Sequence, residues 1–209
     1  MHKQDLAIFN TKRSIAAFAL AFACAGANAA TLLSDNFNSE TAGLNQLTFA
    51  NFAVSGGTVD VIGNGFFDFF PGSGLFIDLD GSSGQAGLFS SQSSFSLVPG
   101  TTYQLSYSLA GSQRGDTNMV TVSLGSAFSQ SYTFLSSDPL TTFSNVFTVA
   151  APVSAMLTFQ NAGGDNVGAI LDNVSLTSTM APVPEPETYA MMLAGLGIMG
   201  FVARRRRKI

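Results

Sequence analysis

The chain has 209 residues, of which 46% are hydrophobic and 11% are charged, and its formal net charge is −4. Between residues 30 and 180, ten acidic residues face a single basic residue, Arg114, and so acidic a stretch would repel phosphate backbones, which excludes nucleic-acid binding. The only histidine, His2, and the only cysteine, Cys24, lie within the first 29 residues, so the remainder lacks the preferred zinc ligands, any disulfide, and the Ser–His or Cys–His pairs of nucleophilic catalysis.

Residues 1–29 are typical of a secretory signal peptide. Lys12 and Arg13 precede an apolar stretch over residues 14–26, and Ala27 and Ala29 place small residues at both positions that determine cleavage. We expect signal peptidase to cleave after Ala29, which places the following domain outside the cytoplasm.

Residues 30–180 have the usual size of one domain. Apolar and polar residues alternate with a period of two, as in the segment 102–109, where Tyr103, Leu105, Tyr107 and Leu109 share one face. No window has the pattern of an amphipathic helix. The predicted strands cover 46–54, 58–62, 74–79, 86–97, 102–109, 120–124, 155–159, 141–149 and 168–178. About nine or ten short strands of this kind predict an all-β, antiparallel sandwich.

An unusual run of aromatic residues, Gly65-Phe-Phe-Asp-Phe-Phe-Pro71, follows the second of these strands. Alternation cannot bury both members of each phenylalanine pair in a half-exposed strand. Either one pair covers the edge of a sheet, or Phe66, Phe67, Phe69 and Phe70 present an apolar surface for ligand contact.

Asp78 and Asp80 place two carboxylates on one side of a predicted strand. Such pairs hydrolyse glycosides when one acid has a pKa raised by burial, but a turn formed by Asp80, Gly81 and Ser82 also explains them.

Arg114 and Asp116 flank Gly115 in a polar loop between two predicted strands. Turn chemistry explains this tripeptide better than an adhesion motif does. As the only base of the domain, Arg114 is expected to pair with Asp116 or to contact a ligand hydroxyl.

The C-terminal tail, residues 181–209, has three consecutive parts. Val183-Pro184-Glu185-Pro186 is an extended, accessible strip because proline disfavours helix. The apolar residues 189–203 predict a transmembrane helix of about 22 Å, shorter than a hydrocarbon core of about 30 Å. The basic end, Arg204, Arg205, Arg206, Arg207 and Lys208, would hold the C-terminus in the cytoplasm. This combination predicts a temporary anchor in the inner membrane, with an ordinary membrane anchor as the alternative.

The order of these three parts resembles the PEP-CTERM sorting tail of Gram-negative bacteria, which implies an exosortase as the processing partner. The segments 74–84, 109–118 and 161–176 resemble exported jelly-roll domains that precede such tails, and the last one, ending in Leu-Asp-Asn-Val-Ser-Leu176, is similar to the closing strand of galactose-binding-like carbohydrate-binding modules. The resemblance implies a jelly-roll β-sandwich, a structural calcium ion and, in some members, a sugar site.

The calcium ion implied by this resemblance would be held by carboxylates from the first and closing strand regions, Asp35, Glu40 and Asp172, because these regions pair in such jelly rolls. The resemblance itself extends to Asp172, and the alternative for Asp35 and Glu40 is that they are exposed turn residues. The sugar site is less well matched. Sugar-binding members display exposed aromatic rings, often tryptophan, and this chain has no tryptophan.

The predicted function is that of an exported, non-catalytic protein of the cell surface or extracellular matrix, associated with exopolysaccharide in a biofilm and sorted through its tail. Two alternatives remain open at this point: a hydrolase that acts on the polysaccharide, and an ice-binding or adhesive surface protein.

Overall fold

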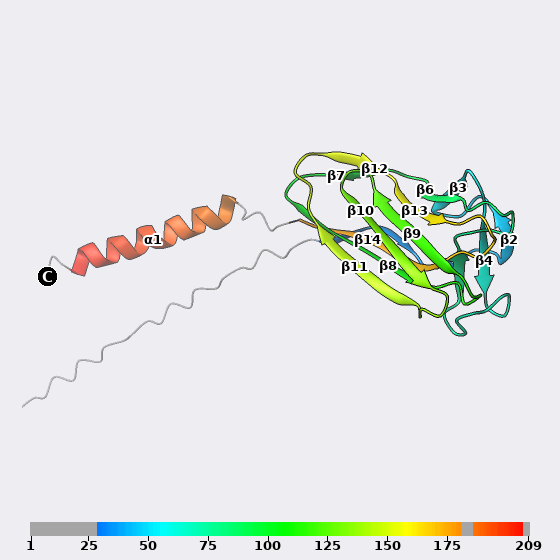
Figure 1. Cartoon of the computed structure of the whole chain (residues 1–209). Helices are drawn as coiled ribbons and strands as arrows, with labels where there is room; N and C mark the ends of the chain where they lie inside the picture. Colours follow the sequence, from blue (N-terminus) through cyan, green and yellow to red (C-terminus); the bar gives the residue numbers. More distant parts are fainter. Residues whose placement is uncertain (1–28, 181–185, 207–209) are drawn as a thin grey trace, which may run out of the picture.

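The computed structural model describes residues 29–180 and 186–206 (Figure 1). The predicted signal peptide lies outside the described residues except for Ala29. The same holds for Val183, Pro184 and Glu185 of the sorting motif and for Arg207 and Lys208 of the basic end.

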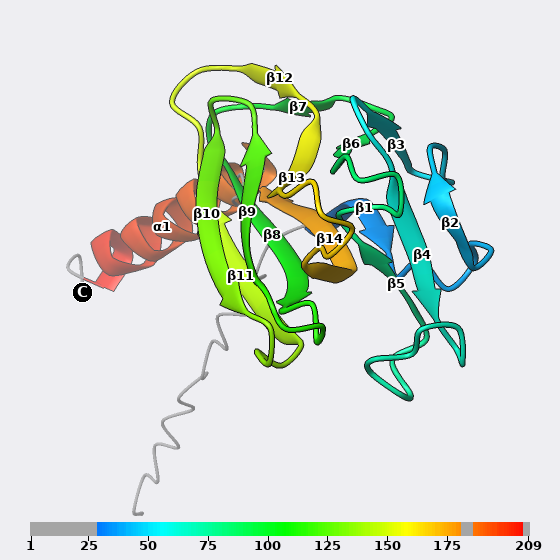
Figure 2. The ribbon, with the colours of Figure 1, turned by 45° about the vertical axis from the view of Figure 1, so that its right-hand side comes forward.

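Two antiparallel sheets pack face to face in a jelly-roll β-sandwich (Figures 1 and 2). The larger sheet has the strand order β11 (Thr141–Phe147), β8 (Thr101–Ala110), β14 (Ile170–Met180), β5 (Leu75–Asp78), β4 (Val59–Gly63) and β2 (Gly43–Gln46), and β1 (Ala29–Asp35) pairs with β14. The smaller sheet has the order β10 (Phe128–Leu135), β9 (Thr117–Leu124), β13 (Leu157–Ala162), β6 (Leu88–Ser91) and β3 (Phe52–Ser55), and β12 (Val153–Ala155) pairs separately with β7 (Phe95–Leu97). The predicted all-β sandwich and the predicted pairing of the first and closing strands are confirmed.

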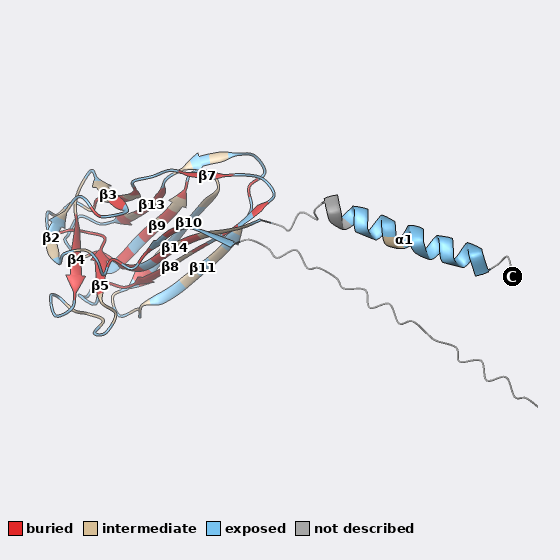
Figure 3. Ribbon diagram, turned by 180° about the vertical axis from the view of Figure 1, so that it is seen from behind, coloured by how far each residue is buried: buried red, intermediate tan, exposed pale blue. Residues whose placement is uncertain are grey.

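The main core lies between the sheets (Figure 3). In β8, Tyr103, Leu105, Tyr107 and Leu109 are buried while Gln104 is exposed, as the alternation predicts. Aromatic rings fill much of the remaining space, and Phe52 stacks on Phe89 with ring centroids 4.5 Å apart. Burying side chains of this size contributes about 1.5–3 kcal/mol each, which stabilises a domain without disulfides.

Several strand boundaries differ from the prediction. The segment 46–54 contains the end of β2 and the start of β3 rather than one strand, because the chain turns at residues 49–52, where the N–H of Phe49 donates to the carbonyl oxygen of Phe52 at 3.0 Å. The segment 86–97 is likewise divided between β6 and β7. No residue range was predicted for β1 or β10, and Ala155 belongs to β12 whereas Leu157 begins β13.

A long loop, residues 64–74, joins β4 to β5 and extends beyond the sheet (Figure 2). Phe69 and Phe70 of this loop pack on a second apolar cluster that contains Ile62, Phe76 and Ile170. The cluster lies on the outer side of the larger sheet, because Ile170 neighbours the inward-facing Leu171 along β14. The loop therefore covers part of one outer face.

The tail contains one helix, α1 (Pro186–Arg206), with three arginines in its last turn. The predicted helical segment 189–203 is therefore confirmed as α-helix and extends further at both ends. The side chains described along α1 are almost all exposed (Figure 3). In the part of the chain that the structure describes, no helix combines the length and the sustained apolarity of a membrane span, and the predicted membrane anchoring stays a prediction.

Candidate functional site

An acidic cluster, defined as Asp60, Asp78, Asp80 and Asp165, lies where β4 and β5 meet the loops that precede β14. Asp60 and Asp78 are partners across β4 and β5, and Asp78 is also the partner of Ile170 in β14. Asp60, Asp78 and Asp80 are at most 3% exposed. Buried carboxylates need hydrogen bonds or counter-charges, and the surrounding loops supply most of them.

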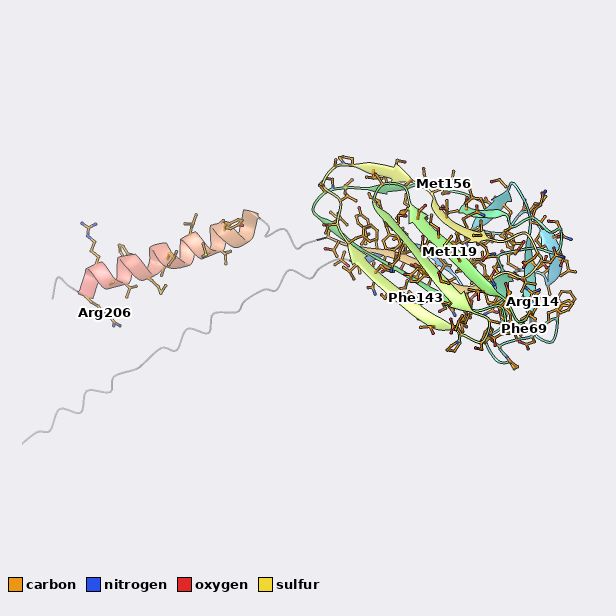
Figure 4. The ribbon with its side chains drawn as sticks, in the orientation of Figure 1. Phe69, Arg114, Met119, Phe143, Met156 and Arg206 are labelled. Atoms are coloured by element: carbon orange, nitrogen blue, oxygen red, sulfur yellow. The ribbon has the colours of Figure 1, made fainter. Side chains whose placement is uncertain are left out.

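Arg114 supplies the counter-charge of Asp78. Its guanidinium pairs with Asp78 Oδ2 and donates to the carbonyl oxygen of Asn166 at 2.7 Å. It also lies 5.7 Å from the ring centre of Phe69, which adds a cation–π contact (Figure 4). The predicted pairing of Arg114 with Asp116 is therefore wrong, since the guanidinium reaches across to β5.

Asp78 has its full set of partners. The backbone N–H groups of Asp80 and Gly168 donate to Asp78 Oδ1 at 3.1 and 3.0 Å, and Arg114 occupies Oδ2. Burial nevertheless raises the pKa of Asp78 to about 7, with Arg114 opposing this effect. A substrate has no access to Asp78, which is 1% exposed.

Asp80 is held by the loop between β13 and β14. The N–H groups of Gly164 and Asp165 donate to Asp80 Oδ2 at 2.7 and 3.2 Å. A side chain at position 163 would overlap the same oxygen, so Gly163 allows the loop to approach. Burial raises the pKa of Asp80, and the nearby carboxyl of Asp165 acts in the same direction. Asp80 Oδ1 is buried without a hydrogen-bond partner.

Asp60 closes the turn that follows β5. The N–H of Ser82 and the hydroxyl of Ser82 donate to its two carboxylate oxygens at 3.2 and 2.7 Å, and the N–H of Asn45 donates to Oδ1 at 2.7 Å. The turn interpretation of residues 80–82 thus agrees with the hydrogen bonds, although the carboxylate that organises the turn is Asp60.

Asp116 belongs to a separate polar network. It accepts hydrogen bonds from Ser112 and Asn118, and Asn118 in turn accepts one from Asn161. This network joins the β8–β9 loop to β9 and β13. A ligand contact by Arg114 or Asp116 stays a prediction, and in this structure both side chains already bind other parts of the protein.

The four phenylalanines of the β4–β5 loop divide into two pairs. Phe69 and Phe70 pack on the second apolar cluster, whereas Phe66 and Phe67 are 38% and 55% exposed and contact each other edge to face. Phe67 also has a positive φ of 48°, which is unusual for a bulky residue. Both interpretations of the run therefore apply, one to each pair, and the ligand contact itself stays a prediction.

The three carboxylates predicted to hold calcium are only partly brought together. Burial raises the pKa of Asp172, and the nearby Asp35 raises it further, to about 6. Glu40 instead accepts a hydrogen bond from the N–H of Ala50 at 2.8 Å. Asp35 faces a polar pocket of about 410 Å³, lined by Ser34, Asp35, Asn36, Ser39, Asn51, Asn173, Val174 and Ser175.

Every oxygen of Asp35 and Asp172 already accepts a hydrogen bond, from Phe37, Asn51 and Asn173. Within residues 29–180 and 186–206, no group of three or more His, Cys, Asp or Glu side chains is placed to hold a metal ion. The donor set at Asp35 and Asp172 is therefore smaller than predicted, and calcium at this position stays a prediction.

Sequence reasoning missed Asp60 and Asp165 as members of the acidic cluster. The available signal was the segment Gly163-Gly164-Asp165-Asn166, because two adjacent glycines before an acid indicate a close backbone approach. What the sequence does not reveal is that Asp80 is the group approached, since 84 residues separate it from Gly164.

Comparison with known proteins identifies the tail. Residues 182–207 match the family model of the PEP-CTERM protein-sorting motif, so the predicted sorting motif is confirmed, and it implies an exported protein that an exosortase processes. Comparison with curated proteins gives no match.

Solved structures similar to the sandwich include carbohydrate-binding modules. The CBM22-1 and GH10 modules of the Clostridium thermocellum endo-1,4-β-D-xylanase 10B, complexed with xylohexaose, are 17% identical with a TM-score of 0.42, and the match covers 70% of this chain and 28% of that one. The CBM22-1 xylan-binding domain of Paenibacillus barcinonensis Xyn10C is 14% identical with a TM-score of 0.43, covering 75% of this chain and 99% of that one.

Proposed function

We propose that this protein is exported and that its tail holds it transiently in the inner membrane, because residues 182–207 carry the PEP-CTERM protein-sorting motif. An exosortase then delivers it to the cell surface or extracellular matrix. There it associates with exopolysaccharide without catalysing a reaction. The match to the sorting motif is the observation on which the proposed export and sorting rest. The three arginines at the end of α1 support the orientation with the C-terminus in the cytoplasm.

The uncharged smaller sheet supports contact with a polysaccharide. None of its five strands contains a charged residue. On the face opposite the core, Ser129, Ser123, Thr158 and Ser90 lie in register across four neighbouring strands. Hydroxyl groups without nearby charge suit the hydroxyls of a polymer better than they suit a charged ligand.

Burial disfavours the alternative of a polysaccharide hydrolase. Asp78 and Asp80 do have raised pKa values, as a catalytic acid needs. Both side chains are at most 1% exposed, however, and Asp78 Oδ2 is occupied by Arg114. A glycosidic oxygen would not reach either carboxyl without rearrangement of the loops.

A structural calcium ion belongs to the same proposal. Asp35 and Asp172 would supply its carboxylate ligands, and the carbonyl and amide oxygens around the polar pocket would complete a hard-oxygen site. Such an ion would fasten β1 to β14.

Fractionation of a bacterium that encodes an exosortase tests the sorting. We expect the full chain to reach the cell surface, and the variant Pro184→Ala/Pro186→Ala to remain in the inner membrane. Pro152→Ala, in the sandwich, is the matched control. Equal surface delivery of the motif variant would contradict the sorting proposal.

Binding of the surface-delivered protein to the exopolysaccharide of the same cells tests the second part. Sedimentation with the polymer supports the proposal, whereas release of reducing ends would favour the hydrolase. Shaping of ice crystals without sedimentation would favour the ice-binding alternative.

A further inference from the structure

Asp80 contains a buried carboxylate oxygen for which the fold provides no partner. In the part of the chain that the structure describes, only two side-chain oxygen or nitrogen atoms are buried without a hydrogen bond, Asp80 Oδ1 and Asp68 Oδ1. Asp80 as a whole is 0% exposed. A buried, unpaired carboxylate oxygen is costly, so a group outside the protein is expected to satisfy it.

The fold places a second carboxyl beside this orphaned oxygen. The N–H groups of Gly164 and of Asp165 itself donate to Asp80 Oδ2 at 2.7 and 3.2 Å, and the Asp165 carboxyl is near enough to help raise the pKa of Asp80. Two ionised carboxylates can only accept. A bridging water, a shared proton or a cation can lie between them, and Asp165 is itself exposed to solvent.

No side chain of residues 30–180 can supply this cation. Arg114 is the only base in that range, and its guanidinium binds Asp78 and the carbonyl of Asn166. The neutralising cation consequently comes from solution.

Further oxygens lie around the gap between the 81–84 and 163–166 loops. A methyl group added to Gly84 would be 3.4 Å from Asn166 Oδ1 and 3.9 Å from the Gly164 carbonyl, and one added to Gly164 would be 3.6 Å from the Gly84 carbonyl. Carboxylate, amide and backbone carbonyl oxygens together form the donor set that calcium prefers.

We propose that Asp80 and Asp165 bind a divalent cation of the calcium type, which links the turn after β5 to the loop between β13 and β14. Two carboxylates supply the charge, and carbonyl oxygens and water complete the shell, because calcium takes about six to eight oxygen ligands. The site is separate from Asp35 and Asp172, and it does not depend on the proposed sorting or polysaccharide contact.

Calorimetric titration of the full chain in detergent, after treatment with a chelator, tests the site with calcium chloride as the probe. Asp80→Asn and Asp165→Asn are each expected to weaken calcium binding about tenfold or more, since each removes one of two charged ligands. Asp138→Asn is the charge-matched control, because the Asp138 carboxylate binds the N–H of Leu135 in the turn after β10. Asp172→Asn separates this site from the one expected between β1 and β14.

The variant Asp80→Asn also shows whether a loss of binding reflects unfolding. Its amide oxygen can keep the bonds from Gly164 and Asp165, and its NH₂ group can donate to the Asp165 carboxylate. We therefore expect its Tm in chelator to equal or exceed that of the natural chain, and calcium to raise the Tm of the natural chain only. If calcium gives neither heat nor a Tm shift, or if Asp80→Asn binds it normally, a proton or a water molecule satisfies Asp80 Oδ1 and the proposal is overturned.

Discussion

Arg114 of the β8–β9 loop pairs with Asp78 at the end of β5, although 36 residues separate them in sequence. Within the described residues this is the only salt bridge. Because Asp78 is almost fully buried while Arg114 remains partly exposed, the pair both neutralises a carboxylate and anchors the loop over Phe69.

Replacing Arg114 with methionine should lower the free energy of unfolding by about 2–4 kcal/mol, because it leaves Asp78 buried without its counter-charge. The double variant Arg114→Met/Asp78→Asn should be more stable than Arg114→Met alone, since it removes both charges. Chemical denaturation of the four chains forms a double-mutant cycle. Purely additive effects would contradict a stabilising role of the pair.

The hydroxyl of Tyr107 gives the sandwich a sensitivity to alkaline pH. It lies 2.7 Å from the hydroxyl of Tyr132, and burial, followed by this hydrogen bond, raises the pKa of Tyr107 above its ordinary value of 10. Above pH 10 the unfolded chain therefore loses this proton more readily than the folded chain, so stability is complete below pH 10 and falls as the pH rises further.

Tyr107→Phe should cost about 1–2 kcal/mol at pH 7.5, because the hydrogen bonds of its hydroxyl with Tyr132 and Asn145 are lost, and should reduce the loss of stability between pH 9 and 11. Denaturation midpoints of the natural and variant chains at these pH values provide the measurement. Tyr103→Phe, which removes the hydroxyl that accepts the N–H of Val98, is the matched control. Parallel curves for the natural chain and Tyr107→Phe would show that Tyr107 does not cause the alkaline effect.

The sequence predicts the fold class well because alternation reports burial directly. In β8 the four predicted inward residues are all buried, although Ser108 of the predicted polar face is buried as well. Boundaries were less predictable where a local turn decides them, as at residues 49–52, where the chain turns between β2 and β3. The acidic cluster was largely out of reach, because Asp78, Arg114 and Asp165 meet only through the folding of distant loops.

Mutation should distinguish the exposed pair of the phenylalanine run, Phe66 and Phe67, from the partly buried pair, Phe69 and Phe70. Phe67→Gly is expected to stabilise the protein by about 0.5–1 kcal/mol, since glycine adopts the positive φ at this position without strain. Phe70→Ala should instead cost about 1–3 kcal/mol, because the partly buried Phe70 packs edge to face on the fully buried Phe76.

Thermal denaturation of both variants, followed by sedimentation with exopolysaccharide, distinguishes stability from binding. If the exposed pair contacts the polymer, Phe67→Gly loses binding while its Tm is unchanged or higher. Destabilisation by Phe67→Gly would mean that the ring contributes packing that its exposure does not reveal.

Asp172 faces another acid rather than a donor of positive charge. Burial and the neighbouring Asp35 raise its pKa to about 6, so at pH 7 the folded protein holds an unfavourable negative charge there. Asp172→Asn removes that charge, and in chelator it should stabilise the protein by about 1–3 kcal/mol. With excess calcium the order should reverse if an ion bridges Asp35 and Asp172, because the natural carboxylate would then be a ligand.

Asp116→Asn provides the contrasting case, since Asp116 accepts hydrogen bonds from Ser112 and Asn118 and has no acidic neighbour among these partners. Its loss of charge should destabilise the protein by about 1–3 kcal/mol with or without calcium, because charge-assisted bonds are weakened. The Tm values of the natural chain, Asp172→Asn and Asp116→Asn, each measured in chelator and in calcium, distinguish a carboxylate repelled by an acid from one held by hydrogen bonds. A destabilised Asp172→Asn in chelator would show that the hydrogen bonds from Asn173 to the Asp172 carboxylate outweigh the repulsion by Asp35.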